Sequence, residues 1–208
     1  MLHLSTIQKK IGARKQGVLT EHESLQAAVM LPLVENEKKE LSIVFEVRAH
    51  HLKRQPGEIC FPGGRIDASD SSPEQAATRE LSEELGVKKE AVKLIAPLDI
   101  IVTPFRGLIY PFVGVIQTRE RMVVNHEEVD HIFTVPLSYF LEYTPKIYKM
   151  GVQFQPDETF PLHQIANGGA YQKRTTYVSE YFYYYKEYVI WGITARILTH
   201  FLQLLKGG

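Results

Sequence analysis

The segment Gly57–Val87, GEICFPGGRIDASDSSPEQAATRELSEELGV, decides the fold of this chain. Its pattern predicts a strand end, a glycine turn, a loop and then a helix. Ser72 at the N-cap, Pro73 at the first helical position and Gln75 as the partner in a capping box predict the start of the helix. Gly86 predicts its end, because glycine tolerates the left-handed conformation that terminates helices.

The predicted helix carries a cluster of carboxylates. Glu80, Glu83 and Glu84 lie at i, i+3 and i+4, so they share one face, which we expect to be exposed. Like charges at this spacing repel each other, and the most direct reason for them is a hard divalent cation, commonly Mg²⁺ or Mn²⁺. Taken alone, the helix fits a solvated acidic face equally well. An adjacent apolar stripe should dock the helix on a core; it consists of Ala77, Leu81 and Leu85.

Arg79–Val87 (RELSEELGV), together with Gly64 upstream, resembles the signature of the Nudix hydrolases. That signature is a glycine, five residues, Glu, seven residues, and then Arg-Glu-apolar-any-Glu-Glu-any-Gly-apolar. The second half matches at every fixed position. The first half departs, because Asp70 stands in place of the Glu and one extra residue separates it from Arg79.

The resemblance implies an α/β fold, a Nudix α/β/α sandwich with a mixed β-sheet and a catalytic loop-helix. It implies a metal-dependent diphosphatase that uses Mg²⁺ or Mn²⁺. The implied metal ligands are Glu80, Glu84, Glu83 and the backbone carbonyl of Gly64. Arg79 is expected to orient the glutamates through an ion pair. The implied general base is a signature residue, Glu83 or Glu84, or a loop carboxylate, Glu128 or Glu127, which a plain surface role explains equally well.

The segment before the signature resembles one branch of this family in particular. Arg48–Gly57 (RAHHLKRQPG) leads into Phe61–Gly64 (FPGG), as in the coenzyme A pyrophosphatase branch of the Nudix hydrolases. This chain has Lys53 and Gln55 where the branch usually has Arg and His, and Lys does not replace Arg at a bidentate phosphate site. The Asp70 variant with its longer loop is usual in this branch.

The basic segment is expected to contact phosphates held near the helix, although without the neighbouring motif a solvated basic loop would be the better interpretation. The expected substrate-binding residues are Arg48, His51, Lys53, Arg54 and Thr103. Cys60, between two apolar residues, is interpreted as a small buried residue and not as a nucleophile.

The composition bounds the class of protein. A chain of 208 residues predicts one domain, 1–208. Lys+Arg and Asp+Glu both total 24, so no basic field indicates a nucleic-acid partner. A single cysteine cannot form an internal disulfide, and no apolar run approaches the roughly 18 residues that span a bilayer. We therefore expect a cytoplasmic protein with no membrane partner and a small-molecule substrate; a homodimer is one option.

The remaining pattern predicts the other elements. Residues 1–23 should form a helical preamble, and a last helix is expected at about 190–206, with an apolar face of Ile197, Leu198, Phe201, Leu202 and Leu205. The tyrosine-rich stretch 145–188 is assigned to core or sheet packing, with stacking on an adenine as the alternative. Strands are expected at 26–34 and 41–47, which should form a hairpin, and at 92–102 (interrupted at Pro97) and 109–116, with a loop at 103–107. A strand-to-helix transition is expected at 132–143.

The function implied by the resemblance is hydrolysis of the diphosphate of coenzyme A or an acyl-CoA, giving 3′,5′-ADP and the 4′-phosphopantetheine product. One alternative is a Nudix pyrophosphatase acting on ADP-ribose, a nucleotide sugar or a dinucleotide. An alternative of another class is a non-catalytic Nudix ligand sensor, which usually shows a damaged glutamate set; this chain's set is intact.

Overall fold

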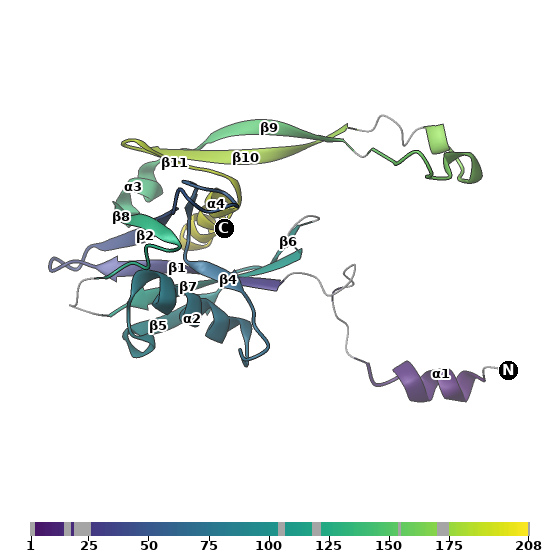
Figure 1. Ribbon diagram of the computed structural model, residues 1–208, viewed down its shortest axis with the longest axis horizontal. Helices are drawn as coiled ribbons and strands as arrows, with labels where there is room; N and C mark the ends of the chain where they lie inside the picture. Colours follow the sequence, from purple (N-terminus) through teal and green to yellow (C-terminus); the bar gives the residue numbers. More distant parts are fainter. Residues whose placement is uncertain are drawn as a thin grey trace.

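The computed structural model describes residues 3–14, 18, 26–103, 107–117, 122–153, 155–169 and 175–207. Within them, an eight-stranded sheet has the central order β3-β2-β1-β7-β5, with β4 on β1, β6 on β7 and β8 on β2 (Figure 1). The strands are β1 (Gln26–Glu35), β2 (Leu41–Arg48), β3 (Ile59–Cys60), β4 (Gly63–Arg65), β5 (Val92–Pro97), β6 (Ile101–Thr103), β7 (Gly107–Ile116) and β8 (Val129–Pro136).

The sheet is mixed, as the sequence predicts. β1 pairs antiparallel with β2, forming the expected hairpin, and parallel with β7. The predicted interruption at Pro97 separates β5 from β6. The predicted glycine turn, in contrast, is wrong: Gly63 and Gly64 belong to strand β4, which pairs with β1. Residues 104–106 of the predicted loop lie outside the described residues.

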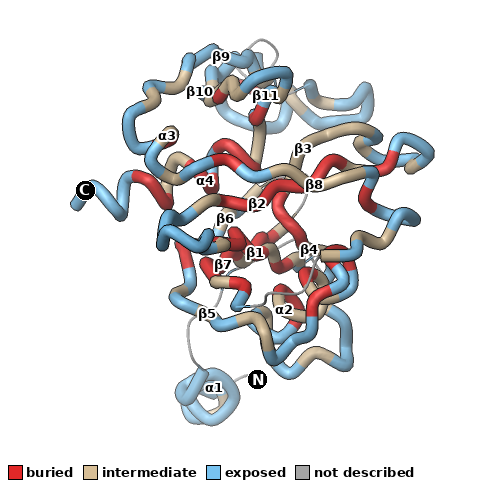
Figure 2. Tube along the Cα trace, turned by 90° about the vertical axis from the view of Figure 1, so that its left-hand side faces the viewer, coloured by how far each residue is buried: buried red, intermediate tan, exposed pale blue. Residues whose placement is uncertain are grey.

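Helices α2 (Pro73–Leu85) and α4 (Gly192–Leu205) cover opposite faces of the sheet (Figure 1). The other helices are α1 (Leu4–Ile11) and α3 (Leu137–Glu142), with short 3₁₀ turns at Lys89–Ala91 and Leu162–Gln164. Side chains of β1 alternate between the faces, so Ala28 and Met30 join the core under α2, whereas Leu31 and Leu33 join the core under α4. Figure 2 shows the buried residues gathered along the central strands and between them and these helices.

A second sheet of three strands lies beyond α4, formed by β9 (Lys146–Gln153), β10 (Thr175–Tyr185) and β11 (Tyr188–Ile190). This separate sheet was not expected from the sequence pattern. Its aromatic residues do pack, as expected for the tyrosine-rich stretch: Tyr183 is buried, meets Phe140 edge-on at 5.6 Å between ring centroids, and hydrogen-bonds Thr199 of α4 at 2.8 Å.

The ends of the chain match the predictions in part. α4 begins and ends close to the predicted limits, and its predicted apolar face is buried except for Leu205, which is exposed because it lies in the last turn. α1 falls within the predicted preamble and has no buried residue, while parts of 1–23 lie outside the described residues. None of the helices in the described part of the chain has the length and hydropathy that a bilayer-spanning segment needs.

Candidate functional site

Local signals fix both ends of α2. The Ser72 hydroxyl accepts a hydrogen bond from the Gln75 amide at 3.3 Å, and Gly86 ends the helix at φ 65°. The return bond of the predicted capping box is displaced by one residue, because the Gln75 side chain accepts from the Ser71 amide. The predicted stripe of Ala77, Leu81 and Leu85 is buried against the sheet. These contacts fix how α2 presents its carboxylates.

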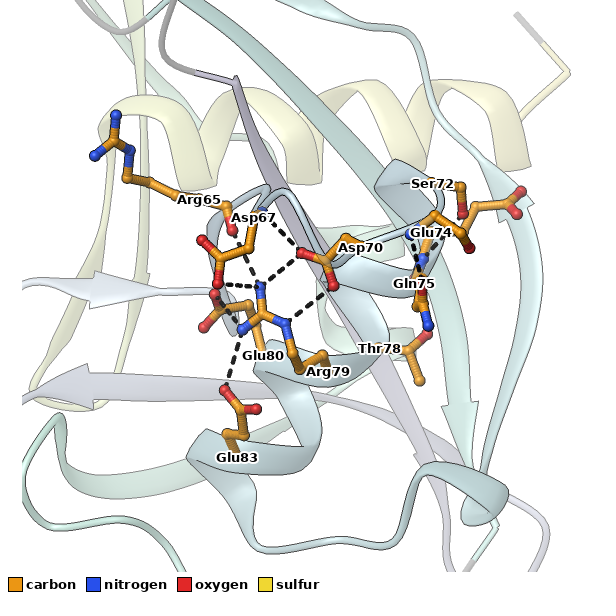
Figure 3. A network of polar contacts seen from close by, with 11 residues as sticks. Arg65, Asp67, Asp70, Ser72, Glu74, Gln75, Thr78, Arg79, Glu80 and Glu83 are labelled. Atoms are coloured by element: carbon orange, nitrogen blue, oxygen red, sulfur yellow. Dashed lines mark hydrogen bonds and ion pairs between the residues drawn. The ribbon is translucent and has the colours of Figure 1, made fainter.

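Arg79 connects the carboxylates of the loop and the helix (Figure 3). Its guanidinium donates to both oxygens of Asp70 at 3.1 and 2.9 Å, to Glu80 at 2.9 Å and to Glu83 at 3.1 Å. It also donates to the carbonyl oxygen of Arg65 at 3.1 Å. Hydrogen bonds from Arg79 lower the pKa of Asp70. The shorter carboxylate at position 70 therefore anchors the arginine that holds the two glutamates.

The three carboxylates of α2 have different surroundings, so the prediction of one exposed acidic face is wrong. Glu83 is exposed and Glu80 is half-buried, but Glu84 is only 2% exposed. The reason is β4, which packs on this face: the Gly63 amide donates to the Glu84 carboxylate at 2.8 Å. Burial raises the pKa of Glu84, and the nearby charge of Glu46 raises it further.

The two glycines of β4 make this close approach possible. A Cβ atom on Gly63 would lie 2.5 Å from the Ala28 carbonyl oxygen and 2.7 Å from the Val29 Cα. A Cβ atom on Gly64 would lie 2.4 Å from the nearer carboxylate oxygen of Glu80. Gly63 is therefore required by backbone packing, whereas Gly64 leaves room for a functional side chain.

One buried carboxylate was not among the residues predicted from the sequence. Glu46 lies in β2, is 1% exposed, and accepts a hydrogen bond from the Cys60 thiol at 3.0 Å. Burial raises the pKa of Glu46 and of Cys60, which disfavours the thiolate form that a nucleophile needs. Cys60 is half-buried and not fully buried as expected, because it also lines a pocket beside β4. An acid within the apolar run LSIVFEV was the signal that could have identified Glu46.

The donor set fits a hard divalent cation. It consists of the carboxylates of Glu80 and Glu84 on α2 and of the buried Glu46 on β2. The charges of Glu46 and Glu80 act on Glu84, and one oxygen of Glu46 has no hydrogen-bond partner. In the described part of the chain, no three acidic, His or Cys side chains converge at ligand distance. The carboxylates instead bond to Arg79 and Gly63, the partners described above.

The basic loop and the predicted loop carboxylate are joined by backbone contacts. The Ala49 amide donates to the carbonyl oxygen of Glu128 at 2.9 Å, and the His51 side chain lies 3.1 Å from the carbonyl oxygen of Glu127. The side chain of Glu128 is exposed, and its charge acts on Glu84. Of the predicted base candidates outside α2, Glu128 therefore lies within electrostatic reach of the cluster.

A pocket of about 400 Å³ lies beside β4, on the α4 side of the sheet. Its lining includes Arg48, Gly63 and Gly64 from the main sheet, Met150 of β9, and Trp191 and Arg196 at the start of α4. Two carboxylates, Glu58 and Glu180, also line it. Of the predicted substrate-binding residues, only Arg48 lines this pocket. Lys53 and Arg54 are exposed on the loop, His51 contacts Glu127, and Thr103 ends β6.

The fold and site describe an α/β protein with a carboxylate-bearing helix on one face of the sheet and, on the α4 side of strand β4, a pocket whose lining includes two arginines. A family model described as the NUDIX domain matches residues 24–146. A Mus musculus protein named peroxisomal coenzyme A diphosphatase NUDT7 is 35% identical over 157 residues, covering 74% of this chain and 65% of that protein. The chain belongs to the Nudix hydrolase family, and its predicted resemblance to the coenzyme A branch is confirmed.

Other relatives are less informative about substrate. A protein of Enterobacter sp. (strain 638) named uncharacterized Nudix hydrolase NudL is 31% identical over 175 residues, covering 83% of this chain and 79% of that protein. A solved C. elegans Ap4A hydrolase binary complex aligns with a TM-score of 0.47 at 15% identity, covering 57% of this chain and 84% of that chain. The family match ends at residue 146, so β10, β11 and α4 lie beyond it.

We predict that Asp70→Asn lowers the melting temperature, whereas Asp67→Asn does so far less. Asp70 is 3% exposed at the side chain and 2.9 Å from the Arg79 guanidinium, while Asp67 is 63% exposed and 3.7 Å from it. Because the pKa of Asp70 is lowered in the folded protein, the ion pair stabilises the fold above the ordinary pKa of aspartate. This contribution is lost as the pH falls through the lowered pKa, so the difference between Asp70→Asn and wild type should vanish in strong acid. A constant difference at every pH would contradict the ion-pair assignment.

We predict that alanine at the two glycines of β4 has different effects, mainly on stability at Gly63 and mainly on activity at Gly64. Gly63→Ala places a methyl group against backbone atoms, which should cost about 1–3 kcal/mol of folding free energy. Gly64→Ala meets the movable end of Glu80, so the fold should survive while the carboxylate is displaced and hydrolytic activity falls. Thermal unfolding and turnover of both variants measure these effects. Equal melting temperatures for the two variants would contradict the packing argument.

Proposed function

We propose that this Nudix hydrolase cleaves the diphosphate of coenzyme A or an acyl-CoA, releasing 3′,5′-ADP and the 4′-phosphopantetheine product. The observation that carries the proposal is the pocket beside Gly63 and Gly64, which combines two guanidinium groups, Arg48 and Arg196, with apolar walls and with the carboxylates of Glu58 and Glu180. Such a pocket suits a ligand with anionic phosphates and an apolar or heterocyclic part. The identity of 35% to a protein named as a coenzyme A diphosphatase supports the same substrate class.

The proposed roles follow from the positions of the side chains. Nudix hydrolases require a divalent cation, and we propose Mg²⁺ or Mn²⁺ held by Glu80, Glu84 and the Gly64 carbonyl, with Glu83 assisting. A cation bound there neutralises the diphosphate and lowers the pKa of coordinated water. Arg79 fixes Glu80 and Glu83 through its 2.9 and 3.1 Å contacts.

The remaining groups act on water and substrate. Glu128, or a signature glutamate, accepts the proton of the water that attacks one phosphorus, while the bond from that phosphorus to the bridging oxygen breaks. Arg48, from the wall of the pocket, binds phosphate oxygens. Lys53, Arg54, His51 and Thr103 are retained as proposed contacts for the parts of a long substrate that extend beyond the pocket.

We also propose a domain extent, a cellular location and an oligomeric state for the enzyme. The whole chain, 1–208, is proposed to form one domain, although the family match covers residues 24–146. A cytoplasmic location is proposed for this chain, while the mouse relative is named as peroxisomal. A homodimer remains a proposal that sedimentation analysis would test.

The direct test is a mass-spectrometric product assay with Mg²⁺ or Mn²⁺ that offers coenzyme A, acetyl-CoA, ADP-ribose and a dinucleotide side by side. We expect 3′,5′-ADP and a phosphopantetheine product from the first two. Preferential cleavage of ADP-ribose or the dinucleotide would overturn the substrate while keeping the Nudix chemistry. Glu84→Gln should lower turnover by orders of magnitude in a folded protein, and turnover near that of wild type would refute the ligand assignment.

Trp191 provides a separate test of the pocket. It is half-exposed at the pocket wall and stacks on Phe182 with ring centroids 5.8 Å apart. Removing this apolar wall should weaken substrate binding, so we expect Trp191→Ala to raise KM about tenfold with a much smaller change in kcat. Tyr177→Ala is the matched control, since Tyr177 is 68% exposed on β10 and does not line the pocket. Equal KM values for wild type and Trp191→Ala would place the substrate elsewhere.

A further inference from the structure

Glu46 is a buried acid that forms no ion pair with a described residue, although the charge of Arg48 acts favourably on it. One carboxylate oxygen accepts from the Cys60 thiol, a weak donor, and the other has no hydrogen-bond partner. In the described part of the chain, this oxygen and the Nε of Arg48 are the two buried side-chain polar atoms in that condition. Burial of an unpaired carboxylate is costly, so an acid at this position of a core strand requires an explanation.

The sheet directs Glu46 toward the carboxylates of α2. Side chains of a strand alternate between its faces, and Val44, two residues before Glu46, packs with Leu81 and Leu85 in the core under α2. Glu46 therefore points to the same side. Its neighbour in the pairing register is Cys60 of β3, just before the β4 glycines.

Electrostatic interactions identify the groups around it. The charges that act on Glu84 are those of Glu46, Glu80 and Glu128, with Glu46 the largest of the three. Arg79 is occupied by Asp70, Glu80 and Glu83 and makes no contact with Glu46. The charge of Arg48 acts favourably on Glu46, whereas the charges of Glu128 and Glu80 act against it. Glu46 therefore lies near one guanidinium and several acids, and a bound cation would supply the positive charge that these acids still lack.

We propose that Glu46 contributes a carboxylate to the divalent-cation site formed by Glu80 and Glu84, with Cys60 holding its other oxygen in place. The inference rests on the proposed function, because it assumes that α2 binds a cation. Hard divalent cations take six or more oxygen ligands, and the number of charged ligands tunes their affinity. Glu46 sits on a central strand of the sheet, so it supplies its oxygen from a rigid element and not from a mobile loop.

The test is a measurement of Mn²⁺ binding in the absence of substrate, with electron paramagnetic resonance or calorimetry as the readout. We expect Glu46→Gln to bind Mn²⁺ at least about tenfold more weakly than wild type, by analogy with the loss of other metal-site contacts. The matched control is Glu35→Gln, an exposed carboxylate at the end of β1, which should bind like wild type. The metal-free melting temperature of Glu46→Gln should equal or exceed that of wild type, because the amide removes a buried charge.

The outcomes separate this inference from the proposed function. Wild-type Mn²⁺ affinity in Glu46→Gln, with affinity lost in Glu84→Gln, would overturn the role of Glu46 alone. Wild-type affinity in both variants would overturn the proposed cation site on α2. If Glu46→Gln does not fold, Glu46→Asp keeps the charge and withdraws the oxygens by one methylene. Weaker Mn²⁺ binding by that variant supports the inference, and unchanged binding overturns it.

Discussion

The close approach of strand β4 to helix α2 is the contact on which the rest of the site depends. Two consecutive residues without side chains allow the strand to pack on the carboxylate face of the helix. The Gly63 amide then reaches Glu84, and the Gly64 backbone lies beside Glu80. Because β4 also pairs with β1, the position of the helix is set by the central strand of the sheet. The sheet therefore fixes the position of the two glycines, and through them the position of the carboxylates on α2.

Charge balance explains why this arrangement needs so many polar partners. Asp70, Glu80 and Glu83 share a single guanidinium, Arg79, which satisfies them through hydrogen bonds at the surface end of the helix. The deeper pair, Glu46 and Glu84, forms no ion pair with a described residue; Arg48 acts on Glu46 through its charge alone, and burial raises the pKa of both acids. The outer carboxylates are thus paired with a positive charge, whereas the buried carboxylates carry negative charge that is not fully compensated. A site of this kind is suited to bind an added cation, because the compensating charge is missing where burial is greatest.

Features that depend on contacts between residues close in the sequence could be predicted, whereas features that depend on distant residues could not. The limits of α2 were predictable because its caps are local contacts between residues at most four positions apart. The family signature identified Arg79 and the glutamates, and the two apolar runs 26–34 and 41–47, separated by a charged turn, identified the hairpin. The burial of Glu84 was not predictable, since it results from β4, twenty-one positions away along the chain. Glu46 was missed for the same reason: its neighbours come from β3 and α2, and its own strand showed only one unexplained acid among apolar residues.

The wall of the pocket explains why the signature indicates the reaction better than the substrate. Gly63, Gly64 and Arg48 come from the segment that the family motif covers, whereas Met150, Trp191 and Arg196 come from β9 and α4, beyond residue 146. The second sheet packs on α4 through Tyr183 and Thr199, so it holds the start of α4 against the main sheet. Changes in this sheet can therefore reshape the pocket without moving a single carboxylate of α2. Under the proposed function, the residues for substrate recognition and those for chemistry come from different layers of the fold, so a change in one layer can leave the other intact.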